Sequence, residues 1–256
     1  MSYRSIFDLR KKVVVVVGGA GLIGSEIVKG LSDFGAKVYI ADTNKKAVKK
    51  IMAKGVKFIN LDITSEDSVH KALNEICNEA QKIDVLINCA YPRTSDWSFK
   101  LEDVTFDSWK DNVNSHLGGY FLCSKVAADL MKKKAKGVII NFASIYGVVA
   151  PDFSIYQGTK MTMPVAYSAI KGGIIAFTKY LATYYAKYNI RANVISPGGV
   201  FNGQDSVFLK KYAIKTPLNR MADSKDIVGA VIFLSSDASS YITGQNLIVD
   251  GGWSVW

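Results

Sequence analysis

Five consecutive valines, Val13–Val17, run directly into the glycine-rich turn GGAGLIG at Gly18–Gly24, close to the start of the chain. A continuous apolar run of this kind is typical of a strand that is buried on both faces of a parallel sheet. Apolar residues at three- and four-residue spacing then predict a helix over Leu22–Phe34. A buried strand, a glycine turn and a helix in direct succession indicate the first unit of an α/β fold.

The rest of the 256-residue chain repeats this alternation of short β-rich runs and longer helical patterns. No linker or low-complexity stretch divides it, so we expect one α/β domain over residues 1–256, with a parallel sheet covered by helices on both faces. Apolar residues make up 49% of the chain, which is enough for a sizeable core. The predicted strands are Val13–Val17, Lys37–Ala41, Val56–Asn60, Asp84–Asn88, Val138–Phe142, Ile190–Ile195 and Leu247–Val249.

The glycine turn predicts a dinucleotide-binding site. Glycines permit a tight turn and let the backbone approach a pyrophosphate, while the N-terminus of the following helix favours its negative charge. A glycine pattern alone is weak support, but this one lies between a strand and a helix, as the motif requires. The expected cofactor contacts in the turn are Gly18, Gly21, Leu22, Ile23 and Gly24.

A carboxylate at the end of the second strand indicates which dinucleotide binds. Asp42 follows Gly24 by 18 residues, and a carboxylate there can bind both ribose hydroxyls and repel the 2′-phosphate of NADP. No arginine follows Asp42 directly, so we expect NAD rather than NADP; an ordinary turn aspartate is the alternative. Asp62, which ends the third strand, is expected to contact the adenine together with Ile63, or else to cap a nearby helix.

The segment Tyr167-Ser168-Ala169-Ile170-Lys171 predicts a catalytic pair. Positions four apart on a helix share a face, so the phenol and the ammonium lie side by side. A close ammonium lowers the pKa of a phenol from its usual value of about 10, so Tyr167 can take the proton of an alcohol while hydride leaves for the cofactor. Ser144 ends the fifth strand and can hydrogen-bond the substrate oxygen. A surface helix pair is the alternative interpretation of Tyr167 and Lys171.

Taken in order along the chain, these motifs resemble those of the short-chain dehydrogenase/reductase family. The resemblance implies a seven-stranded, doubly wound (Rossmann) sheet, hydride transfer, binding of the nicotinamide ribose by Tyr167 and Lys171, and a homodimer or homotetramer with the Tyr167 helix at an interface. It also implies cofactor contacts from Asn88, Ala90, Pro197, Gly198 and Val200. The matching motifs are the glycine turn, Asp42, Asn88-Cys89-Ala90, Ser144, Tyr167 with Lys171, Pro197-Gly198, Thr243-Gly244 and Asp250-Gly251-Gly252.

Two residues depart from the pattern of that family. Tyr91 stands where a glycine is usual beside the cofactor, and His116 stands where the family has the asparagine of its proton relay. We hypothesise that His116 carries the relay; a packed helix histidine is the alternative. The glycine spacing is also more like that of the family's sugar-nucleotide-modifying members.

A third departure is length. Ser144 and Tyr167 are 23 residues apart, more than is usual in the family, because of the segment Pro151–Pro164. Loops on a rigid scaffold tend to carry specificity, so we expect substrate loops near residues 145–164 and 199–220. The expected substrate contacts are Tyr146, Tyr156, Asn202 and Gln204.

The formal net charge of +10 does not by itself indicate a nucleic-acid partner. The lysines form short scattered groups, such as Lys132–Lys134 and Lys210-Lys211, which we interpret as a solvated surface. No apolar run approaches the roughly 20 residues of a membrane span, and two histidines with three separated cysteines do not form a metal site. We expect a cytoplasmic protein with a small-molecule substrate and no nucleic-acid, membrane or metal partner.

The sequence therefore predicts an NAD-dependent oxidoreductase that interconverts a secondary alcohol and a ketone on a polar substrate of the sugar type. The sugar assignment draws on the glycine spacing, the polar loop and a similarity to bacterial surface-glycan and flagellin-modification oxidoreductases. One alternative is a ketoreductase of 3-oxoacyl thioesters, which would prefer NADP. Another is a non-catalytic NAD-binding subunit or sensor.

Overall fold

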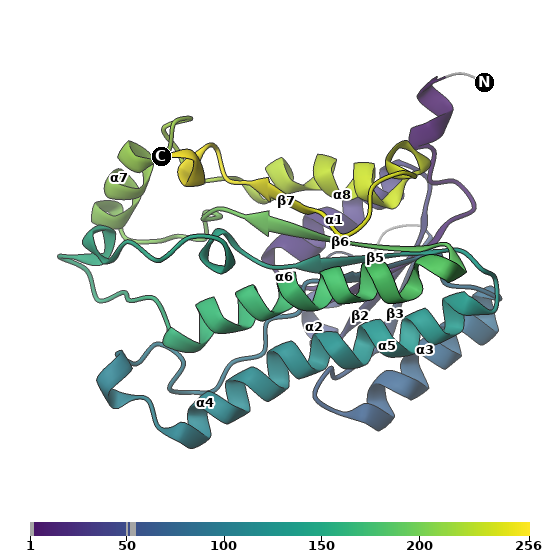
Figure 1. The fold of residues 1–256 in the computed structure, drawn as a ribbon, viewed down its shortest axis with the longest axis horizontal. Coiled ribbons are helices and arrows are strands. Elements are labelled where there is room, and N and C mark those ends of the chain that lie inside the picture. The colour runs from purple at the N-terminus through teal and green to yellow at the C-terminus, as the bar shows by residue number, and fades with distance from the viewer. Residues whose placement is uncertain (1–2, 50, 52–54) are drawn as a thin grey trace.

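The computed structural model describes residues 3–49, 51 and 55–256, and its centre is a seven-stranded sheet (Figure 1). The strand order is β3-β2-β1-β4-β5-β6-β7, and all neighbouring pairs are parallel. The ends of every strand agree with the predicted ranges to within two residues, and the predicted α/β class is confirmed. The strands are β1 (Val13–Val17), β2 (Lys37–Asp42), β3 (Val56–Asn60), β4 (Val85–Asn88), β5 (Gly137–Phe142), β6 (Ile190–Pro197) and β7 (Asn246–Val249).

Helices cover both faces of the sheet. In Figure 1, α1 and α8 lie on one side, and α3, α4, α5 and α6 lie on the other. A π-helical turn, Asn114–Gly118, joins α4 to α5. Within the described residues, no helix is long and apolar enough to cross a membrane. The helices are α1 (Leu22–Asp33), α2 (Lys45–Val48), α3 (Glu66–Ala80), α4 (Phe106–Val113), α5 (Gly119–Lys132), α6 (Val165–Tyr185), α7 (Ser206–Lys215) and α8 (Val228–Ser235).

The valines of β1 show how the sheet builds two cores. Successive side chains of a strand point to opposite faces. Val13, Val15 and Val17 therefore pack with α3, α5 and α6, while Val14 and Val16 pack with α1 and α8. Every valine of β1 is buried, because helices cover both faces of this strand. Each position therefore needs an apolar residue, which explains the unbroken run.

The strand order reverses between β1 and β4: from β1 the chain continues to β2 and β3 on one side, and from β4 it continues to β5, β6 and β7 on the other. After β1 the chain passes to α1 on one face, whereas after β4 it passes to α4 and α5 on the other face (Figure 1). The segments that follow β1 and β4 therefore diverge and leave a crevice at the carboxyl edge of the sheet, which is where open α/β sheets bind their ligands. The glycine turn and the segment Asn88–Ala90 both lie at this edge.

Candidate active site

The glycine turn after β1 is made by close approach of backbone to backbone. Gly18 has φ = +78°, and a Cβ atom there would lie 2.5 Å from the Cα of Ala90. A Cβ on Gly24 would lie 2.3 Å from the carbonyl oxygen of Gly18. Gly21 caps α1 without a side-chain hydrogen bond, so the first amides of the helix, including those of Leu22 and Ile23, are open to an anion. This cradle fits a pyrophosphate.

Asp42 lies beside the cradle at the end of β2. Its carboxylate accepts hydrogen bonds from the backbone amides of Ala20 (2.9 Å) and Asn44 (2.8 Å). A carboxylate offers about four lone-pair positions, so acceptor capacity remains for ribose hydroxyls. The turn-aspartate interpretation thus describes part of the role of Asp42, because the same bonds fix its carboxylate in the crevice.

The side chains of Asp62 and Ile63 contribute to local structure at the end of β3. Asp62 accepts hydrogen bonds from the amide and the hydroxyl of Thr64, at 2.9 and 2.7 Å, while Ser65 caps α3. Ile63 is buried against Gly119: a Cβ atom on Gly119 would lie 2.6 Å from the Cδ1 atom of Ile63. Both residues stand at the carboxyl edge, but the helix cap is Ser65 and not Asp62.

Asn88 turns its side chain into the protein. Its amide donates to Asn141 (2.8 Å) and to Ser124 (3.1 Å), and Asn141 donates in turn to Thr178 (3.0 Å). This buried network ties β4 and β5 to α5 and α6. The side chain of Asn88 therefore stabilises the floor of the crevice. The nearby Ala90 takes part through its backbone, since its carbonyl oxygen accepts a hydrogen bond from the hydroxyl of Tyr120 at 3.2 Å.

Ser144, Tyr167 and Lys171 come together where β5 meets α6. Ser144 caps the short 3₁₀ turn that follows β5, and α6 carries Tyr167 and Lys171 one turn apart. Gly147 allows this approach, since a Cβ there would lie 2.6 Å from the carbonyl carbon of Lys171. Burial raises the pKa of Tyr167, and a hydrogen bond from Ser144 opposes the rise. Three of the four residues predicted to be catalytic thus lie together at one site.

Lys171 is buried, and no acidic partner for it lies among the described residues. Its ammonium donates to the carbonyl oxygen of Phe142 (2.9 Å) and lies 3.3 Å from Nε2 of His116. Only 4% of the residue is exposed. Burial lowers the pKa of Lys171 to about 7. The Lys171 side chain is therefore poised to exchange a proton, between ammonium and neutral amine, near neutral pH.

His116 lies in the π-helical turn and is fully buried. Burial, followed by the charge of Lys171, holds the pKa of His116 well below its usual range, so the imidazole is neutral. Since Nε2 faces an ammonium, it must accept, and we assign the single proton to Nδ1, which has no hydrogen-bond partner among the described residues. Single π-helical turns occur frequently at functional sites.

Aromatic rings enclose the lysine. The centroids of Tyr91, Tyr120 and Tyr167 lie 5.9, 5.6 and 5.5 Å from its Nζ atom. Trp97 packs edge-on against Tyr91 and Tyr167, with centroid distances of 5.6 and 6.1 Å. The sequence singled out the bulk of Tyr91, but no local signal marked Tyr120 or Trp97.

Comparison with known proteins places this site in a family. The family model described as enoyl-(acyl carrier protein) reductase matches residues 19–254. Post-translational flagellin modification protein A of Campylobacter coli is 34% identical, over 96% of this chain and 100% of that protein. An NAD-dependent glycerol dehydrogenase of Listeria innocua is 33% identical, over 97% and 96% of the two chains. A crystal structure of a short-chain dehydrogenase from Leptospira borgpetersenii with bound NAD⁺ superposes with a TM-score of 0.87 at 39% identity, covering 99% of this chain and 96% of that one.

The chain belongs to the short-chain dehydrogenase/reductase family. As a short-chain dehydrogenase/reductase it is an oxidoreductase that acts on CH–OH groups with NAD or NADP. The resemblance of its sequence motifs is thereby confirmed.

The long segment after Ser144 packs against α7 in this short-chain dehydrogenase/reductase. Tyr146 and Tyr156 are buried, and the hydroxyl of Tyr156 donates to that of Tyr146 at 3.4 Å. Both tyrosines belong to a third apolar cluster that borders Tyr167, together with Ile145, Ile155, Phe208, Tyr212, Met221 and Trp253. The two predicted substrate residues therefore lie beside Tyr167, the tyrosine predicted to be catalytic.

The second predicted loop starts at the end of β6 and uses its polar groups internally. Gln204 accepts from the amide of Asn202 (2.7 Å) and donates to the carbonyl oxygen of Val200 (2.9 Å). Asn202 is exposed. Gly198, after Pro197, passes close to the C-terminal segment: a Cβ on Gly198 would lie 2.9 Å from the Cα of Asp250.

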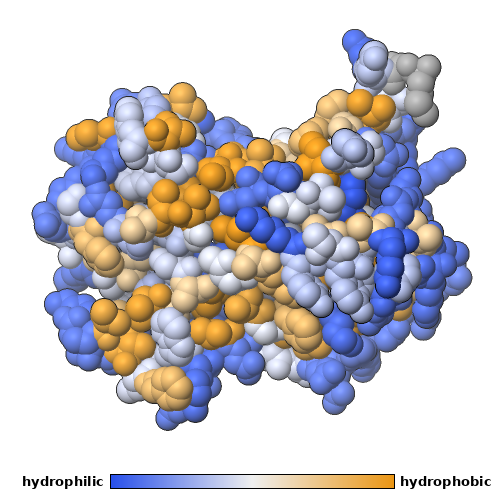
Figure 2. All heavy atoms as spheres, viewed as in Figure 1, coloured by the Kyte–Doolittle hydropathy of each residue, from blue (hydrophilic) through white to orange (hydrophobic). Residues whose placement is uncertain are grey.

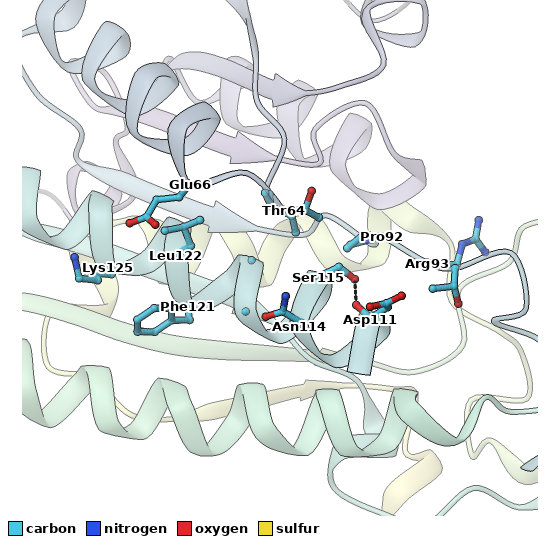
Figure 3. Close-up of a pocket in the computed structure, with 14 residues that line it drawn as sticks. Thr64, Glu66, Pro92, Arg93, Asp111, Asn114, Ser115, Phe121, Leu122 and Lys125 are labelled. Atoms are coloured by element: carbon cyan, nitrogen blue, oxygen red, sulfur yellow. Dashed lines mark hydrogen bonds between the residues drawn. The ribbon is translucent and has the colours of Figure 1, made fainter. Parts of the chain in front are cut away.

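A groove of about 630 Å³ lies along α4, the π-helical turn and α5 (Figure 3). Asn114 and Ser115 line it from the same turn that buries His116, and the hydroxyl of Ser115 donates to the carbonyl oxygen of Asp111 at 2.6 Å. The groove contains none of the residues predicted to be catalytic. The loops after β3 and β4 also line it, and it includes Ile63, which is a predicted cofactor contact.

Proposed function

We propose that this protein is an NAD-dependent dehydrogenase/reductase that interconverts a secondary alcohol and a ketone on a polyhydroxylated, sugar-type substrate. The observation that carries the proposal is the buried contact among Ser144, Tyr167, Lys171 and His116 beside an uncapped glycine turn. A sensor that only bound the cofactor would have no need for a buried ammonium without an acidic partner.

The proposed mechanism assigns one role to each residue of this cluster. When bound, NAD supplies the acceptor for the hydride of the alcohol carbon. Ser144 holds the substrate oxygen, and Tyr167 takes the hydroxyl proton as the carbonyl forms. The ammonium of Lys171 favours the phenolate of Tyr167. Lys171 accepts the proton that Tyr167 took and passes one to Nε2 of His116, which lies 3.3 Å away; His116 releases its Nδ1 proton to water, and the phenolate of Tyr167 is restored.

Asp42 supports the choice of NAD over NADP, because a fixed carboxylate beside the cradle would repel a 2′-phosphate. The sugar-type substrate is supported by two relatives, a flagellin modification protein and a glycerol dehydrogenase. It is also supported by the cluster around Tyr146 and Tyr156, whose hydroxyls lie beside Tyr167.

The test is reduction of NAD by the purified protein against polyols, sugars, sugar phosphates and sugar nucleotides, with a parallel NADP series. We expect turnover with NAD on at least one hydroxylated substrate, and a loss of at least about a hundredfold in Tyr167→Phe, the usual scale of acid–base catalysis. Turnover restricted to NADPH and 3-oxoacyl thioesters would favour the ketoreductase instead. NAD binding without any turnover would favour the sensor.

We also propose that the protein is a homodimer or homotetramer with α5 and α6 at an interface. Phe121 of α5 is 49% exposed and packs against Phe177 of α6 at a centroid distance of 5.9 Å. Apolar residues also gather where α4 begins (Figure 2), at Phe99, Leu101 and Phe106. Light scattering should give a multiple of 28.0 kDa, and Phe121→Glu should reduce it; a monomeric wild-type protein would refute the proposal.

A further inference from the structure

Tyr91 covers the catalytic cluster from outside. Its ring centroid lies 5.3 Å from that of His116 and 5.8 Å from that of Tyr167, and the Nζ atom of Lys171 lies 5.9 Å from it. Yet 42% of Tyr91 is exposed, whereas His116 is fully buried and Lys171 nearly so. Tyr91 therefore forms the layer between the solvent and a buried basic pair.

The other titratable groups around the His116–Lys171 pair are uncharged near neutral pH. Tyr120 on α5 and Tyr167 on α6 face the pair, and burial raises the pKa of both phenols. Burial also raises the pKa of the Cys89 thiol, at the end of β4, to about 12. No ion pair found among the described residues includes Lys171 or His116. The pair contacts aromatic rings and a backbone carbonyl. The entry of water is therefore the change in its surroundings that would most affect its protonation.

Two neighbours hold Tyr91 in place. The guanidinium of Arg93 lies 5.2 Å from its ring centroid, and Trp97 packs edge-on at 5.6 Å. Contacts of both kinds are individually worth on the order of 1 kcal/mol. The ring is thus fixed by contacts within its own loop as well as by the residues that it covers.

We propose that Tyr91 is a positioning residue: its ring keeps water away from the His116–Lys171 pair, so that Lys171 exchanges protons through His116 rather than directly with solvent. This inference rests on the proposed function and adds a reason why a histidine is needed beside the lysine. Water would stabilise the ammonium and would also offer it a competing path for the proton.

The first test is the titration of Lys171 in the protein without cofactor. The ¹³C signal of its Cε atom would be followed in lysine-labelled protein and assigned by its absence in Lys171→Met. Tyr91→Gly, or Tyr91→Ala as a second open variant, should raise the pKa of Lys171 by about 1, a tenfold change in proton affinity, because water reaches the ammonium. Tyr91→Leu keeps the bulk without the ring and should leave the titration unchanged. No change in the open variants, or an equal change in Tyr91→Leu, would overturn the proposal.

The second test is a double-mutant cycle on kcat at saturating NAD, with an alcohol that the wild-type protein oxidises. His116→Ala should lower kcat about tenfold or more in the wild-type background, but less than about threefold in Tyr91→Gly, because water then replaces the imidazole. Equal losses in both backgrounds would refute the proposal. If His116→Ala had no effect in either, the relay of the proposed function would fail, while the titration would still decide whether Tyr91 shields Lys171.

Discussion

At the scale of single residues, Asp42 illustrates how one carboxylate can serve both the fold and the ligand. Its Oδ2 accepts from the amide of Ala20 and its Oδ1 from the amide of Asn44, so Asp42→Asn would keep one of these two bonds. The charge that repels a 2′-phosphate would be lost. We therefore expect the ratio of kcat/KM for NAD to that for NADP to fall at least about tenfold, roughly the 1.4 kcal/mol of one charged contact. Asp62→Asn is the matched control and should leave the ratio unchanged; the same outcome for Asp42→Asn would contradict the role.

The single residue Ser144 is also expected to affect how kcat/KM depends on pH. Its hydrogen bond lowers the pKa of Tyr167 against the effect of burial, so Ser144→Ala should raise that pKa. Oxidation needs the deprotonated phenol, and its rate rises with pH through this titration. The acidic limb of the kcat/KM profile should therefore move to higher pH in Ser144→Ala, in addition to a loss of rate. Ser168→Ala, beside Tyr167 on the same helix, should leave the limb in place. A loss of rate without a displaced limb would limit Ser144 to holding the substrate.

At the scale of elements, the predictable parts are those with a local cause. The valine run, the glycine turn and the spacing of Tyr167 and Lys171 on one helix each follow from neighbouring residues, and the structure has them as predicted. The direction of the Asn88 side chain did not follow, because it depends on Asn141 and Thr178 in other elements.

The same limit applies to the rings around Lys171. Tyr120 reaches the lysine from α5, and Trp97 packs against Tyr167 from the loop after β4; nothing near either residue in the sequence points to these contacts. Side chains that meet only through the tertiary fold leave no periodic trace in the chain. The sequence predicts where the carboxyl edge lies, but it does not predict which side chains close over it.

The element that borders the substrate side makes a prediction of its own. Lys211 on α7 donates to the carbonyl oxygens of Ser154 (3.1 Å) and Gln157 (2.7 Å), so α7 holds the long segment after Ser144 in place. Lys211→Met should raise the KM for the alcohol about three- to tenfold, with little change in kcat or in the KM for NAD, and should expose the segment to proteases. Lys210→Met, one residue away and exposed, is the matched control. Identical behaviour of the two variants would show that these bonds do not order the segment.

For the whole molecule, we expect the buried ammonium of Lys171 to reduce the free energy of unfolding. Burial lowers the pKa of Lys171 from 10.5 in the unfolded chain to about 7 in the folded protein. Between these values the unfolded chain binds more protons, so stability should rise with pH over this range, and below pH 7 the full penalty remains. The linkage relation gives a gain of roughly 3 kcal/mol between pH 7 and 9.5.

Lys171→Met removes this group and keeps an apolar side chain of similar length. Denaturant unfolding at a fixed protein concentration should therefore show the variant to be more stable than the wild-type protein at pH 7, with a smaller difference at pH 9.5. The comparison at two pH values cancels every other titrating group that the two proteins share. A difference that did not shrink as the pH rose would mean that the ammonium is not buried at neutral pH. The stabilisation of the phenolate by Lys171 would then have to be explained without a desolvated charge.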